Sequence, residues 1–157
     1  MKFLFLLLAF LTTNRASHQN PTVSQTKPSE AVNDAFIGAL LKRVSYARLV
    51  AARYPMKGNA PKLGTGRMVS FSHGANQFTC FKSPDNTFTA SMAITSPEPL
   101  LAPLLTIGQP KTTTLKQLGI SRSQNVLQVS DLEGMALATF YFQTEKLVKV
   151  TFGATID

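Results

Sequence analysis

The chain offers few side chains that could serve as a nucleophile or a general base. Its only cysteine is Cys80, and its two histidines are His18 and His73. Thiol catalysis needs a lowered pKa and a base within hydrogen-bond reach. Cys80 lies on the same predicted strand face as Phe78, which favours a small buried hydrophobe instead. We therefore expect no enzyme activity, and a cysteine-dependent enzyme that uses Cys80 with His73 is the competing class.

Metal and phosphate motifs are equally sparse. The eight carboxylates are scattered along the chain, and the one close pair, Asp131 and Glu133, is typical of a hairpin loop. Gly64-Thr65-Gly66 lacks the preceding strand and following helix that a glycine-rich phosphate loop requires. We expect no metal and no cofactor.

One charge pattern stands out between residues 35 and 84, which contain no acidic residue. Such a positive field attracts anionic partners, for example acidic proteins, phospholipids or lipopolysaccharide. In the alternative interpretation the charged ends are merely solvated, and their aliphatic stems cover a helix flank. The candidate binding residues of this basic segment are Lys42, Arg43, Arg48, Arg53, Lys57, Lys62 and Arg67.

The N-terminus predicts export. A single lysine, Lys2, precedes a run of about nine apolar residues and a polar stretch, the layout of a secretory signal over residues 1–16. The run is shorter than the roughly 20 residues of a stable anchor; an uncleaved membrane anchor is the alternative. Cleavage after Ala16 would lower the net charge from +8 to +6.

The cysteine count supports a bacterial envelope location. One cysteine allows no internal disulfide, and the chain has no Asn-x-Ser/Thr glycosylation site. These features favour a periplasmic or secreted bacterial protein with no disulfide-linked partner. Nucleic acid is not an expected partner, because export separates the chain from it.

The spacing of apolar residues predicts the helices and strands that would position a functional site. Residues 17–29 are polar and proline-containing, which predicts a disordered linker. Apolar residues at helical spacing predict one helix of about 24 residues from Glu30 to before Pro55. A second, short helix is expected over 111–118, ended by Gly119. Alternating apolar residues predict strands over 67–72, 77–82, 87–95, 125–130, 135–143 and 146–152.

This order predicts a single α+β domain over residues 30–157. It would contain two helix-plus-three-strand (αβββ) blocks, 30–96 and 105–152, with antiparallel strands in one sheet or in two packed sheets. Alternation along 135–143 places Phe140 and Phe142 on the packed face. Thr139 and Tyr141 lie on the other face, where they are candidate contacts for a partner protein.

The second block resembles two known families. Its pattern begins with Gly108-Gln109-Pro110 and a short helix that ends in Leu118-Gly119. An aromatic strand segment, 138–142, and a final strand segment, 146–150, complete it. It is similar to the small outer-membrane lipoproteins of the SmpA/OmlA (BamE) group and to the repeats of β-lactamase-inhibitor proteins. Those lipoproteins carry a lipobox cysteine after the signal, which residues 12–17 lack.

The resemblance implies a non-catalytic, exported protein-binding module of the cell envelope, of the inhibitor/immunity or assembly/adaptor type. We expect its partner to be an envelope protein with an acidic surface. The alternative is a binder of anionic lipid or lipopolysaccharide that uses the basic segment 42–67.

Overall fold

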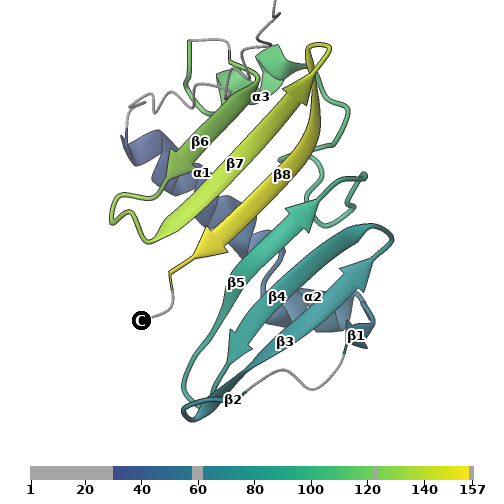
Figure 1. Ribbon diagram of the computed structural model, residues 1–157, viewed down its shortest axis with the longest axis vertical. Helices are drawn as coiled ribbons and strands as arrows, with labels where there is room; N and C mark the ends of the chain where they lie inside the picture. The colour runs from purple at the N-terminus through teal and green to yellow at the C-terminus, as the bar shows by residue number, and fades with distance from the viewer. Residues whose placement is uncertain (1–29, 58–61, 122–123, 156–157) are drawn as a thin grey trace, which may run out of the picture.

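The computed structural model describes residues 30–57, 62–121 and 124–155 (Figure 1). The signal and linker predicted for residues 1–29 lie outside them. The elements are α1 (Glu30–Arg43), α2 (Tyr46–Ala51), β1 (Met56–Lys57), β2 (Lys62–Leu63), β3 (Gly66–His73), β4 (Asn76–Lys82), β5 (Thr87–Ile94), α3 (Lys111–Gln117), β6 (Val126–Ser130), β7 (Ala136–Gln143) and β8 (Lys146–Ala154).

All the described strands belong to one antiparallel sheet. Its order is β1-β3-β4-β5-β8-β7-β6, and β2 pairs with the start of β3. The chain forms two three-stranded meanders, β3-β4-β5 and β6-β7-β8. The pairs Met92↔Phe152 and Ile94↔Val150 join them through β5 and β8. The sheet is therefore continuous, which decides between the one-sheet and two-sheet arrangements.

The predicted organisation in two αβββ blocks is wrong, because the helices do not pack as partners of separate strand triplets. Phe36 of α1 meets Phe140 of β7 edge-to-face, with ring centroids 5.9 Å apart. Tyr46 of α2 meets Phe71 of β3 at 5.6 Å. The N-terminal helical segment thus spans both meanders on one side of the sheet (Figure 1). It is one bent helical cover, and α3 lies at one end of the sheet.

The bend in that cover was not predicted. The chain leaves helical geometry at Ser45 (φ −63°, ψ 154°), which separates α1 from α2. The hydroxyl of Thr89 donates to the carbonyl oxygen of Val44 at 3.0 Å. A hydroxyl from a strand thus satisfies a carbonyl at the end of α1, where the last turn leaves carbonyls without intrahelical partners. The predicted continuous helix of about 24 residues is replaced by two shorter ones joined by this link.

The core lies between the bent cover and the sheet. One face of the strands β3 to β8 supplies its side chains, and α1 and α2 supply the other side. This one-sided burial leaves the opposite face of the sheet without a covering element among the described residues (Figure 1). The largest fully buried side chains include Leu40, Leu49, Phe71, Phe78, Phe140 and Leu147.

Candidate functional site

The uncovered side of the sheet, here called the open face, is neutral over most of its width. Strand register aligns its residues in rows that cross six strands. Neither of the two central rows contains a charged residue. One row is Ser72, Gln77, Ala93, Thr151, Thr139 and Gln128, and the next is Ser70, Thr79, Ser91, Gly153, Leu137 and Ser130.

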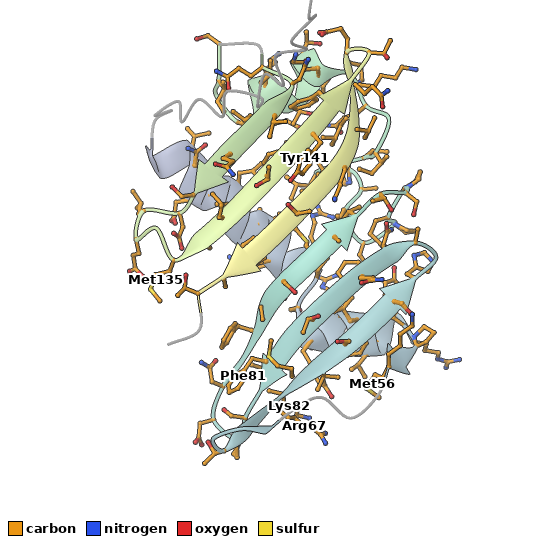
Figure 2. All side chains as sticks on the ribbon, viewed as in Figure 1. Met56, Arg67, Phe81, Lys82, Met135 and Tyr141 are labelled. Atoms are coloured by element: carbon orange, nitrogen blue, oxygen red, sulfur yellow. The ribbon has the colours of Figure 1, made fainter. Side chains whose placement is uncertain are left out.

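The two predicted contacts on this face differ in accessibility. Thr139 is only 6% exposed, because it lies in the middle of a row between Thr151 and Gln128. Tyr141 is half-buried, and Nζ of Lys149 lies 5.2 Å from the centre of its ring. Tyr141 is therefore the accessible one of the pair, on β7 of the upper meander in Figure 2.

The residues of the predicted basic segment lie on several different elements. Lys42, Arg48 and Arg53 are exposed on and after the bent cover, and Lys57 is exposed on β1. The guanidinium group of Arg43 already has a partner within the protein, because its Nη1 donates a hydrogen bond to the carbonyl oxygen of Ala102 at 2.8 Å. That bond ties α1 to the connection between β5 and α3.

Register brings two of the predicted residues together with a third that the sequence analysis missed. Lys62 on β2 is opposite Arg67 on β3, and Arg67 is opposite Lys82 on β4. We call these three positions the basic row. Lys82 lies outside the segment 42–67, and only the strand pairing reveals that it is a neighbour of Arg67.

Two members of the basic row, Arg67 and Lys82, line an open cavity of about 570 Å³. The rest of its lining is residues 64–66, from the β2–β3 turn and the start of β3, and residues 83–84. Arg67 is exposed. Lys82 is held on its other side, where its Nζ lies 3.4 Å from the hydroxyl of Tyr46 and 4.7 Å from the centre of that ring. Figure 2 shows Arg67 and Lys82 at the lower end of the sheet.

A second group that the sequence analysis missed centres on Glu98, which is 3% exposed. Its carboxylate accepts hydrogen bonds from the Tyr54 hydroxyl, from Nδ1 of His73 at 3.1 Å and from Nδ2 of Asn76 at 3.1 Å. The backbone N–H of Leu100 donates a fourth bond at 3.2 Å. Burial, reinforced by the adjacent carboxylate, raises the pKa of Tyr54.

The Glu98 network binds parts of the chain that are distant in sequence. It joins the residues after α2, the β3–β4 turn and the connection after β5. His73 also stacks on Tyr54, with ring centroids 4.6 Å apart. All four bonds to the carboxylate come from protein groups, so the network is built as a structural clasp. A glutamate flanked by Pro97 and Pro99 was its only sequence signal.

Cys80 and His73 are not brought together. Cys80 is fully buried and lies opposite Val69, whereas His73 lies at the far end of β3, opposite Asn76. The Cys80 sulfur is 3.9 Å from the hydroxyl of Thr89. Burial raises the pKa of the Cys80 thiol, which opposes formation of a reactive thiolate. His18 lies outside the described residues.

Neither a metal-ligand cluster nor a membrane-spanning helix occurs in residues 30–57, 62–121 and 124–155. No group of three or more histidine, cysteine or acidic side chains is placed to hold a metal ion there. The helices in these ranges are too short or too polar to cross a bilayer. Comparison of the chain with protein-family models, with curated proteins and with solved structures gave no match.

Proposed function

We propose that this chain is an exported, non-catalytic module that binds a protein of the bacterial cell envelope on the open face of its sheet. The observation that carries the proposal is the pair of neutral rows across that face. Solvated protein surfaces normally carry many charged side chains. The centres of protein interfaces are depleted of charge and enriched in aromatic residues such as Tyr141.

The size of the face is suited to a protein partner. Six strands at about 4.8 Å spacing give a width of about 24 Å. β7 adds a length of about 26 Å at about 3.3 Å per residue. Such a patch is comparable to the roughly 800 Å² that each partner buries in a standard interface. Because the sheet is already formed, binding costs little ordering entropy.

Charge favours an acidic partner. The positive side chains at the edges of the neutral rows are Lys149, beside Tyr141, and Lys57, which lies opposite Ser70 on the neighbouring strand. Positive groups around a neutral centre steer an acidic protein into register and raise its association rate. The partner class is therefore an envelope protein whose contact surface has an acidic rim.

Site-specific photo-crosslinking in cells of the source organism tests this proposal. A photoreactive phenylalanine analogue would replace Gln77 or Gln128 on the open face. The matched controls would carry it at Val50 or Ala51, which are exposed on α2. We expect the same discrete product from both open-face positions and none from the α2 positions.

A charge-insertion variant sharpens the test. Ser91→Glu places a negative charge in the middle of a neutral row, and we expect it to abolish the crosslinked product while the melting temperature stays unchanged. Crosslinks of equal yield from α2 and from the open face, or a product unaffected by Ser91→Glu, would contradict the proposal.

A second candidate function is binding of an anionic lipid or lipopolysaccharide. The observation that favours it is the basic row, whose positive charges are adjacent in the sheet. Vesicle binding that persists in Ser91→Glu but is lost on substitution of the basic row would favour this candidate over the protein module.

A further inference from the structure

We propose that the cavity beside the basic row binds the phosphate group of a phosphate ester. This site is independent of the open-face surface. Arg67 and Lys82 alternate with Val69 and Cys80, so they lie on the helix-covered side of the sheet, as the contact of Lys82 with Tyr46 also shows. The failure of one proposal therefore leaves the other standing.

The first argument is the uncompensated charge of the row. Like charges directly opposite each other on neighbouring strands destabilise a sheet. Among the described residues, the close contacts between basic and acidic side chains are His73–Glu98 and Lys111–Glu145, and neither involves Arg67 or Lys82. A bound anion would remove the repulsion that the protein itself leaves unbalanced.

The second argument is how the cations are held. Lys82 rests against the face and the hydroxyl of Tyr46, two neutral groups that fix its position without neutralising its charge. Arg67 is exposed, and its guanidinium carries planar donors that match phosphate oxygens. Lys82 therefore offers a cation in a fixed position, and Arg67 offers one that can adjust to the same phosphate group.

The third argument is the shape and lining of the cavity. Its volume of about 570 Å³ is large enough for a phosphate group and part of the molecule that bears it. The β2–β3 turn supplies Gly64, at φ +57°, and a Cβ there would meet nothing within 4 Å. Glycines leave the backbone N–H groups open to close approach by an anion. Asp85, the nearest carboxylate along the chain, is exposed and outside the lining.

Direct titration of the full chain tests the site. The probes are inorganic phosphate, glycerol phosphate, and vesicles of phosphatidylglycerol with phosphatidylcholine vesicles as the neutral reference. The variants are Arg67→Gln and Lys82→Gln, singly and combined. The matched control is Lys42→Gln with Arg48→Gln, which removes the same charge from exposed helix positions outside the cavity.

We expect the combined Arg67/Lys82 variant to lose at least about tenfold in affinity, as charge-assisted bonds to phosphate predict. The control should change affinity by less than about twofold. Binding of soluble phosphate and glycerol phosphate would identify a soluble ester, and binding of phosphatidylglycerol vesicles alone would identify a lipid head group. Equal losses in the control and the cavity variant, or no binding of any probe, would overturn the proposal.

Thermal unfolding supplies a second readout that does not need tight binding. Without ligand at low salt, the combined variant should melt at a higher temperature than the wild type, because the cross-strand repulsion is gone. Added phosphate should raise the melting temperature of the wild type and leave that of the variant unchanged. A variant that melts lower than the wild type and still responds to phosphate would contradict the assignment.

Discussion

The carboxylate of Glu98 lies 3.1 Å from Nδ1 of His73, although one residue precedes α3 and the other ends β3. Asn76 strengthens the link, because its Oδ1 accepts the backbone N–H groups of Thr95 and Ser96 at 3.0 and 3.1 Å. The connection that leaves the first meander is thus fixed to the β3–β4 turn. That connection leads the chain towards the second meander, so the Glu98 clasp helps to hold the joined sheet.

Replacing Glu98 by alanine should destabilise the fold strongly. The substitution removes the acceptor of the Tyr54 hydroxyl and of the Leu100 N–H, and it leaves the Asn76 amide only its bond to the carbonyl oxygen of Ser96. Each donor that loses its acceptor costs about 1–3 kcal/mol. We expect a total loss of about 3–5 kcal/mol in the free energy of unfolding, measured with urea. The control is Glu133→Ala, an exposed carboxylate. A loss below about 0.5 kcal/mol for Glu98→Ala, the usual size for a surface substitution, would show that the clasp is not structural.

Tyr54 should contribute to the free energy of unfolding at neutral pH, and this contribution should be lost at alkaline pH. Burial raises the pKa of Tyr54 above its ordinary value of 10.0, so the folded state holds the phenol proton more tightly than the unfolded chain does. The resulting stability is complete below pH 10 and is lost as the pH rises towards the folded pKa. We therefore expect the stability advantage of the wild type over Tyr54→Phe to shrink above pH 10.

Thermal unfolding of both proteins from pH 7 to 11 measures this difference. All other ionisable side chains are common to the two proteins, so the comparison isolates Tyr54. At neutral pH the variant should lose about 1 kcal/mol for the missing hydrogen bond. A constant difference between the two proteins across the whole pH range would refute the assignment.

Cys80 should be inert in the folded protein. It is fully buried, and its raised pKa keeps the thiol protonated at neutral pH. We expect a disulfide reagent such as dithionitrobenzoate to label it at pH 8 only after unfolding in guanidinium. The positive control is Ser91→Cys in a Cys80→Ala background, which places a half-buried thiol on the open face. Rapid labelling of native Cys80 would revive the cysteine-enzyme hypothesis.

Local periodicity predicted elements better than it predicted their packing. Alternation along 87–95 and 146–152 indicates β5 and β8, and the short polar connections indicate the hairpins. No local pattern indicates that β5 pairs with β8 or that Phe36 packs on Phe140. These contacts depend on how far the helical cover reaches across the sheet. The predicted organisation in two αβββ blocks requires each helix to cover only the three strands of its own block.

The candidate sites show the same limit. Arg67 was identified from the charge pattern, but Lys82 joins it only through strand register. Glu98 was overlooked because its donors come from residues 54, 73, 76 and 100, and no motif of fixed spacing connects them. The bend after Val44 likewise depends on Thr89, which is 45 positions away in the sequence. Long-range hydrogen bonds of this kind leave no periodic signal.

Replacing Gly66 by a residue with a side chain should destabilise the fold because of a steric clash. This cause can be distinguished from a requirement for the backbone conformation of glycine. A Cβ at this position would overlap the ring of Phe81 on the neighbouring strand, and that ring packs against Phe88 with centroids 5.3 Å apart. Gly66→Ala must displace the ring, at a cost of about 1–3 kcal/mol. Gly153→Ala is the matched control, because its Cβ would meet nothing within 4 Å. The control should be neutral or stabilising by up to about 1 kcal/mol, since alanine lowers the entropy of the unfolded chain.

A double-mutant cycle then identifies the cause. In a Phe81→Leu background the ring is absent, so Gly66→Ala should cost at least about 1 kcal/mol less than in the wild type, the scale of coupling between residues in contact. Urea unfolding of the four proteins gives the coupling free energy. An equal cost in both backgrounds would mean that residue 66 requires glycine for its backbone conformation, and the steric explanation through Phe81 would be wrong.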